Sequence, residues 1–138
     1  MVTISITYEG DLRCRATHGP SNSSLFTDAP VDNKGKGANF SPTDLLATAL
    51  GTCMLTIMGI AAEARSIDIS GTKVTVHKHM MNDPIRKIAK LEVLMILPNG
   101  NYSEKDLTAL SQAASNCPVM MSIHPDIEVD FTLSHSNQ

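Results

Sequence analysis

Three cysteines are the residues of this 138-residue chain with the most chemistry to offer. Cys14 stands between two arginines, Cys53 lies inside a long apolar stretch, and Cys117 directly precedes a proline. A thiolate is a nucleophile and a redox centre, whereas a free cysteine also packs well as a small buried hydrophobe. Spacing alone leaves both interpretations open, because nothing in one sequence shows that Cys53 and Cys117 touch.

Two histidine patterns suggest other chemistry. His77 and His79 share a face of a predicted strand and could bind a metal, but no cysteine or carboxylate stands nearby at ligand spacing. His124 follows Cys117 by seven residues and could serve a Cys–His hydrolase. The sequence shows no Gly-rich oxyanion loop and no orienting Asn for such a hydrolase. The position of His124 before a proline is typical of a turn. We therefore expect neither a metal site nor a hydrolase.

Composition excludes several classes of protein. With 42% hydrophobic and 18% charged residues the chain is not disordered, and three cysteines are too few for a disulfide scaffold. A net charge of −3 and the absence of Trp argue against a nucleic-acid partner. The N-terminus carries no secretory pattern, so we expect a cytoplasmic protein with reduced thiols. The length suits one domain spanning 1–138.

Apolar periodicity predicts the elements that must position these residues. Alternation indicates strands near 2–8, 12–17, 25–27, 72–80, 88–97 and 127–133, with a turn at 9–11 and a loop at 28–39. Capping signatures start one helix at 41–44 and another at 103–106, and the second runs to about Cys117. Strands joined as hairpins, with two helices between them, predict an α+β fold with antiparallel sheets.

The first of these helices has no charged residue from Leu45 to Ala62, so a transmembrane span has to be weighed. Against it stand the sharp start at Ser41 and Pro42, the internal Thr and Gly residues, and flanking strands that would otherwise lack a core. We therefore expect a central helix buried almost all round, and no membrane partner.

The run SPTDLLATALGTCMLTIMGIAAE, followed more than sixty residues later by ASNCPVMMSI, resembles the OsmC/Ohr family, which comprises osmotically induced protein C and organic hydroperoxide resistance proteins. The resemblance spans nearly the whole chain and is closer to the OsmC-like branch. It implies antiparallel sheets packed around a long central buried helix. It also implies an intertwined homodimer with two active sites near the interface.

The resemblance also implies an activity. Family peroxidases reduce organic hydroperoxides with a reactive cysteine and a resolving cysteine, which correspond to Cys53 and Cys117. The thiolate attacks the peroxide and becomes a sulfenic acid, which the second thiol converts to a disulfide. A small dithiol or a dithiol protein then restores both thiols, so no bound cofactor is implied.

Family peroxidases place an arginine from the first strands beside the thiolate, held by a glutamate near the start of the long helix. The candidates here are Arg15 and, slightly less favoured, Arg13. The glutamate position is Thr43, and the nearest carboxylate, Asp44, is also explained as a capping residue. This departure leaves an alternative open, namely a non-enzymatic dimeric module that binds a small apolar ligand or senses redox state.

Overall fold

The computed structural model describes residues 1–136 of the chain. They form two compact units, an N-terminal unit of Met1–Leu46 and a C-terminal unit that begins at Ala47, and each is described by itself. The single domain expected from length stays a prediction. The α+β class is confirmed, since strands and helices alternate through the chain as separate hairpins and helical segments.

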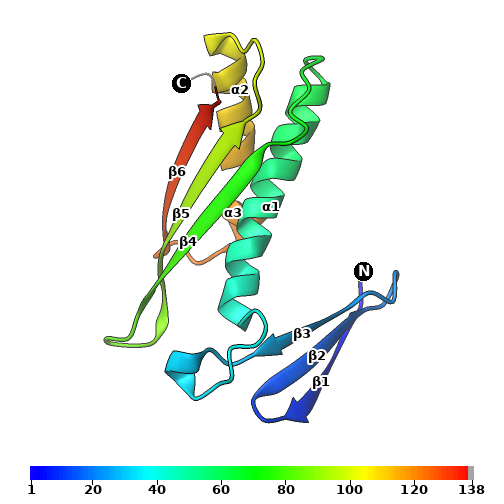
Figure 1. The fold of residues 1–138 in the computed structure, drawn as a ribbon, viewed down its shortest axis with the longest axis vertical. Coiled ribbons are helices and arrows are strands. Elements are labelled where there is room, and N and C mark those ends of the chain that lie inside the picture. The colour runs from blue at the N-terminus through cyan, green and yellow to red at the C-terminus, as the bar shows by residue number, and fades with distance from the viewer. Residues whose placement is uncertain (137–138) are drawn as a thin grey trace. The chain divides into compact units, whose positions relative to one another are not determined.

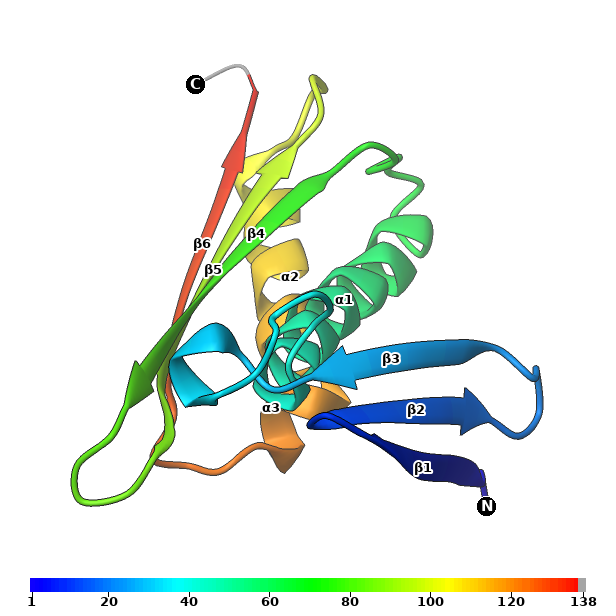
Figure 2. The same ribbon diagram turned by 60° about the horizontal axis from the view of Figure 1, so that its bottom comes forward.

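The N-terminal unit is a three-stranded antiparallel meander (Figures 1 and 2), with the order β1-β2-β3. Its strands are β1 (Ile4–Gly10), β2 (Arg13–His18) and β3 (Ser24–Asp28). The first hairpin turns at Asp11 and Leu12, whose φ angles are 51° and 59°. Two successive positive φ angles are typical of a tight type I′ turn. The turn therefore lies later than the predicted 9–11, and β1 runs on to Gly10.

This unit buries almost nothing apolar. Its only buried residues are Asp28 and Ser41, which are 2% and 1% exposed and are both polar. A short 3₁₀ helix, η1 (Val31–Asn33), lies in the loop that follows β3. Alternate residues of β1, in contrast, leave large apolar side chains in solvent: Ile4, Ile6 and Tyr8. The unit is thus a sheet without a core of its own.

The long helix, α1 (Pro42–Glu63), begins where its capping signature predicts. The Ser41 N–H donates to an Asp44 carboxylate oxygen at 2.8 Å, and the Asp44 N–H donates to the Ser41 hydroxyl at 3.1 Å. These two bonds satisfy N–H groups that the first turn of a helix leaves unpaired. Pro42 sits at the first helical position, where its missing N–H is harmless.

The C-terminal unit holds a second three-stranded sheet, of order β4-β5-β6 (Figure 1). Its strands are β4 (Lys73–Met81), β5 (Lys87–Leu97) and β6 (Glu128–His135). The first pair is antiparallel, but β5 and β6 are parallel. The antiparallel prediction is therefore wrong for this pair. Two helices separate β5 from β6, and such a crossover allows the chain to return in the same direction.

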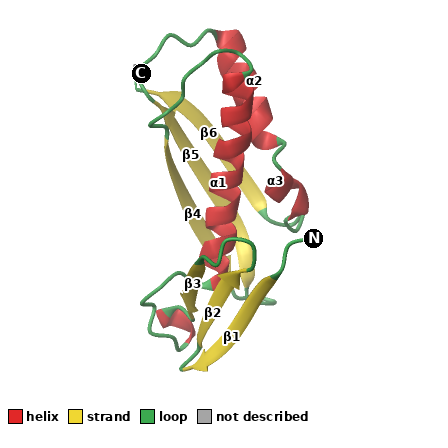
Figure 3. Cartoon of the chain, turned by 90° about the vertical axis from the view of Figure 1, so that its right-hand side faces the viewer, coloured by secondary structure: helices red, strands yellow, loops and turns green. Residues whose placement is uncertain are grey.

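The helices of this unit cover one face of its sheet (Figure 3). Besides α1 they are α2 (Glu104–Ser115) and α3 (Pro118–Ser122). Eight large apolar side chains make up the core between helices and strands: Leu50, Met54, Met58, Leu91, Val93, Met95, Leu97 and Leu110. Each of them is at most 1% exposed. The apolar face of the sheet and the apolar side of α1 thus meet within this unit.

Burial of α1 is one-sided. Thr48, Thr52 and Thr56 lie one turn apart in solvent, whereas Leu50, Met54 and Met58 are completely buried. The expected burial almost all round is wrong for the single chain. With 22 residues and a mean hydropathy of 1.9, α1 is also long and apolar enough to cross a membrane. A core helix passes the same test, and the fully buried side of α1 supports that interpretation.

Candidate active site

The structure brings two of the predicted site residues together, Cys53 and Cys117. Cys53 lies on α1 and is partly exposed, while Cys117 is completely buried, and both are free thiols. The side chain of Cys53 lies near enough to the Cys117 thiol to raise its pKa. The two residues are 64 positions apart in sequence, so the fold of the C-terminal unit creates this proximity. Proximity of the two side chains is a precondition for a disulfide between them.

Cys117 is the N-cap of α3. The sequence predicted it at the end of the preceding helix, and that prediction is wrong. Its backbone is extended, and its sulfur accepts a hydrogen bond from the Met120 N–H at 3.4 Å. Pro118 occupies the first position of α3. The helix α2 stops at Ser115, because the chain turns out of the helix before this proline. A backbone N–H of α3, the helix that Cys117 caps, thereby holds the Cys117 sulfur in place.

Burial raises the pKa of the Cys117 thiol above its usual value of 9.0. The Met120 N–H acts in the opposite direction, and the proximity of Cys53 adds to the rise. Cys117 therefore keeps its proton at neutral pH.

Arg13 belongs to a polar cluster in the N-terminal unit. Its Nε and one terminal nitrogen donate to the two carboxylate oxygens of Asp28, at 2.7 and 3.0 Å. Asn39 donates to the same carboxylate at 3.1 Å. The Arg13 hydrogen bond, together with the other contacts, lowers the pKa of the buried Asp28 to about 2, and the pKa of Arg13 is raised in return. Arg13 is thus bound on two of its nitrogens by a structural partner.

Arg15 lies two residues along the same strand, with a different partner. Its Nε donates to a Glu9 oxygen at 2.8 Å in an exposed ion pair. Neither Asp28 nor Glu9 was singled out from the sequence. Asp28 lies directly opposite Arg13 in the pairing of β2 with β3, which only the strand register reveals. The only sequence signal for these two ion pairs was that charged residues of opposite sign occur in strands predicted to be neighbours.

Asp44 and Thr43 lie in the first turn of α1. Asp44 forms the capping pair with Ser41, and the Thr43 hydroxyl lies 3.1 Å from that of Ser41. Both residues belong to the N-terminal unit, as do the two arginines, whereas the thiols belong to the C-terminal unit. The structure thus gives Asp44 a capping role, and its catalytic role stays a prediction.

The histidines weighed as metal ligands or as part of a hydrolase have carboxylate neighbours. The His79 Nε2 pairs with Glu92 at 3.2 Å on the outer surface of the second sheet. His124 is exposed and contacts Asp126, two residues away. Within residues 1–136, no three His, Cys, Asp or Glu side chains are grouped so as to hold a metal ion.

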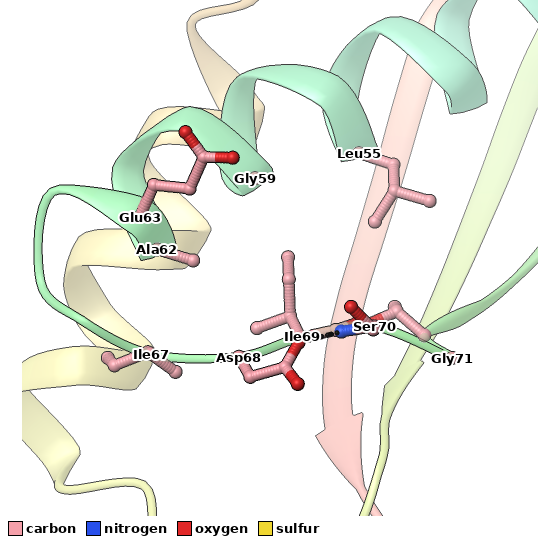
Figure 4. A pocket seen from close by; sticks show the side chains of 10 residues that line it. Leu55, Gly59, Ala62, Glu63, Ile67, Asp68, Ile69, Ser70 and Gly71 are labelled. Carbon is pink, nitrogen blue, oxygen red and sulfur yellow. Dashed lines mark hydrogen bonds between the residues drawn. The ribbon is translucent and has the colours of Figure 1, made fainter.

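A cavity of about 310 Å³ lies in the C-terminal unit, between the second half of α1 and the segment before β4 (Figure 4). Leu55 and Gly59 line it from the helix, and Asp68 and Ile69 line it from the segment. The Asp68 carboxylate accepts a hydrogen bond from the Ser70 N–H at 2.8 Å. No cysteine lines this cavity, so it is separate from the thiol pair.

Comparison with known proteins gives a consistent picture. The model of the OsmC-like protein family matches residues 35–132. A crystal structure from Psychrobacter arcticus 273-4, described as that of a candidate osmotic stress induced and detoxification response protein, is 47% identical. It superposes with a TM-score of 0.90, and the match covers 96% of each chain. None of the curated proteins matches the chain.

More distant structures share the fold. An organic hydroperoxide resistance protein OsmC of Legionella pneumophila is 17% identical, with a TM-score of 0.74 over 97% of this chain and 96% of that one. An organic hydroperoxide resistance protein of Elizabethkingia anophelis is 16% identical, with a TM-score of 0.78 over 99% and 96% of the two chains. At these identities the likeness extends to the architecture alone.

Proposed function

The chain belongs to the OsmC-like protein family, and on that premise we propose that it is a thiol-dependent peroxidase that reduces organic hydroperoxides in oxidative stress defence. The observation that carries the proposal is the proximity of the side chains of Cys53 and Cys117. A buried thiol beside a more accessible one is the arrangement that a two-cysteine peroxide reductase needs.

The first step takes place at Cys53. Its thiolate attacks one peroxide oxygen, the O–O bond breaks, and an alkoxide leaves and takes a proton to become an alcohol. Cys53 is then a sulfenic acid. The thiol of Cys117 attacks this sulfur, so that a disulfide forms and the hydroxyl group leaves, with the Cys117 proton, as water. Overall the peroxide gains two electrons and the thiol pair loses them.

The pair divides the two roles according to exposure and proton affinity. Cys53 is partly exposed, so a hydroperoxide can reach it, whereas completely buried Cys117 is shielded from direct attack. The raised pKa of Cys117 keeps this thiol protonated and therefore a poor nucleophile toward the peroxide. We assign Cys53 as the reactive cysteine and Cys117 as the resolving one. An external small dithiol or dithiol protein would reduce the disulfide by exchange.

The remaining parts of the proposal concern groups outside the thiol pair. Arg15, or Arg13, would stabilise the Cys53 thiolate and the alkoxide as it forms.

We also propose that the protein works in the cytoplasm as a homodimer. The solvent-exposed Ile4, Ile6 and Tyr8 support a second copy, because a contiguous apolar strand face is typical of an interface. Neither nucleic acid nor membrane has a part in this scheme.

Stopped-flow mixing of the reduced protein with cumene hydroperoxide, and separately with hydrogen peroxide, tests the function. We expect prompt loss of two of the three thiols per chain, faster with the organic peroxide. Cys53→Ser should abolish the loss, whereas the matched variant Cys14→Ser should retain it. Thiols that persist for hours in the wild-type protein would contradict the proposal.

One observation favours a second function, a dimeric module that binds a small apolar ligand or senses redox state without turnover. Thr43 stands where family peroxidases carry a glutamate, and Asp44 beside it is engaged in capping α1. The same experiment separates the two, since a binding module keeps its thiols when it is mixed with a hydroperoxide.

A further inference from the structure

The cavity beside α1 combines apolar walls with carboxylates. Leu55 extends from the helix toward the segment before β4, and Ile69 extends from that segment toward the helix (Figure 4). Glu63 lines the cavity from the end of α1, and Asp68 lines it from the segment. The described residues that line it include no Lys, Arg or His. The cavity therefore offers apolar surface together with negative charge alone.

Small residues keep this cavity open. A Cβ at Gly59 or at Gly71, which both line it, would meet no atom within 4 Å. Ala62 contributes a third small side chain. The volume of about 310 Å³ lies at the lower end of the range for small-molecule sites. The cavity is thus suited to a small ligand, and a longer side chain at position 59 would fill it.

Neither carboxylate of the cavity has a cationic partner within residues 1–136. The Glu63 side chain has no hydrogen bond or ion pair there, and Asp68 is bonded to groups of Ser70 alone. The basic residue nearest to both along the chain is Arg65. It donates instead to Asp106 on α2, at 3.0 and 2.6 Å. The described chain thus supplies no countercharge to this cavity.

The charge of Asp68 also acts on a neighbouring group. Burial first, and then the Asp68 carboxylate, raises the pKa of the Tyr102 hydroxyl in the loop before α2. A carboxylate favours the neutral form of an acid beside it, because two negative charges repel each other. The surroundings of the cavity are therefore at a negative potential, which favours a cation.

We propose that this cavity binds a small organic cation, an ammonium group on a short apolar chain. The apolar chain lies against Leu55 and Ile69, and the ammonium group interacts with the carboxylates of Glu63 and Asp68. Apolar walls stabilise an alkyl chain removed from water but add nothing to the binding of a bare metal ion. The site does not depend on the proposed peroxidase function, because no cysteine lines the cavity.

Titration with three compounds that share one alkyl chain tests the proposal. Hexylammonium, hexanol and hexanoate are added in turn to the reduced full-length protein, and the amide NMR signals of Gly59, Ser70 and Gly71 are followed. Hexylammonium should bind about tenfold more tightly than hexanol, because two exposed carboxylates each add a modest attraction. Hexanoate should bind most weakly, because its charge is repelled.

Variants separate the charge of the site from its space. Asp68→Asn should weaken hexylammonium binding about threefold and leave hexanol binding unchanged. Glu128→Gln is the matched control, because it removes an exposed carboxylate that pairs with Lys90 on the outer surface of the second sheet, and it should change neither affinity. Gly59→Met fills the cavity and should abolish the shifts of Ser70 and Gly71 with every compound. Gly59→Ala occupies less of the space and should weaken binding by a smaller factor.

Three results would overturn the proposal. Equal affinities for hexylammonium and hexanol would show that the carboxylates do not select a cation. Binding that persists unchanged in both Gly59 variants would place the compounds outside this cavity. Signals that respond to none of the three compounds would show that the cavity is closed in solution, for example by a second copy of the chain.

Discussion

The two three-stranded sheets of this chain are stabilised in opposite ways. In the C-terminal unit, β5 buries Leu91, Val93, Met95 and Leu97 almost completely under the helices. In the N-terminal unit, β1 of similar alternating sequence leaves Ile6 and its neighbours in solvent. The difference does not come from strand propensity, since both strands are rich in β-branched or large apolar residues. It comes from the presence or absence of a covering layer.

The N-terminal unit has polar bonds in place of an apolar core, and Asp28, the last residue of β3, joins Arg13 and Asn39. Such bonds add little net stability, because the unfolded chain makes comparable bonds with water. Apolar burial is the larger contribution in most domains. The N-terminal sheet therefore needs another surface over its apolar face, which is the physical basis for proposing a homodimer.

The largest effect is expected in the core of the C-terminal unit. Leu50 is completely buried on α1, so Leu50→Ala removes apolar contacts and leaves a cavity. We expect a loss of about 2–5 kcal/mol in the free energy of unfolding, measured by urea denaturation at fixed protein concentration. Leu94→Ala, on the uncovered face of β5, should lose far less. Equal losses would contradict the one-sided core.

The next prediction concerns the apolar face of β1. Ile6→Asp places a charge among side chains that we propose to be covered by a second copy, and it should weaken self-association at least about a hundredfold. Sedimentation equilibrium measures the effect. Ile85→Asp is a matched control, because the two isoleucines are 67% and 65% exposed. If both variants associate like the wild-type protein, β1 is not an interface.

A smaller effect, with a defined pH dependence, is expected at Asp28. Its pKa is lowered from 3.8 to about 2, so its ionised form stabilises the fold above pH 3.8, and this contribution is lost as the pH falls toward 2. Asp28→Asn should therefore lower the denaturation midpoint at neutral pH, with the difference from wild type shrinking between pH 3.8 and 2. A difference that is constant with pH would show that the Arg13 ion pair does not carry the effect.

The smallest effect distinguishes two glycines of α1. A Cβ on Gly59 would meet no atom within 4 Å, so Gly59→Ala should stabilise the helix by about 0.5–1 kcal/mol. A Cβ on Gly51 would lie 2.8 Å from a methyl group of Val76 on β4. Gly51→Ala should therefore destabilise the protein in the same thermal melts. A gain at both positions would show that α1 does not approach β4 closely.

Local signals predicted much of this fold. The start of α1 follows from Ser41, Pro42 and Asp44, because capping depends on residues three apart. Strand alternation located all six strands to within about two or three residues, the usual accuracy of such boundaries. The position of the first turn was missed, because Leu12 is an unusual residue for a positive φ.

Features that depend on distant pairing could not be predicted in this way. The parallel pairing of β5 with β6 and the bulge of β1 at Glu9 are matters of register, to which periodicity within one strand is blind. The proximity of Cys53 and Cys117 depends on the tertiary fold of the C-terminal unit, because the two residues are far apart in sequence. Family resemblance implied that the two cysteines lie close together. No signal in the sequence showed that Arg13 pairs with Asp28 and Arg15 with Glu9.

Peptide mapping under non-reducing conditions, after one equivalent of cumene hydroperoxide, tests the thiol pair most directly. We predict one major product, in which the peptides carrying Cys53 and Cys117 are joined and two hydrogen atoms lighter, while the Cys14 peptide is unchanged. Cys117→Ser should instead add oxygen atoms to Cys53. An unlinked Cys53, or a link that involves Cys14, would contradict the redox role assigned to this pair.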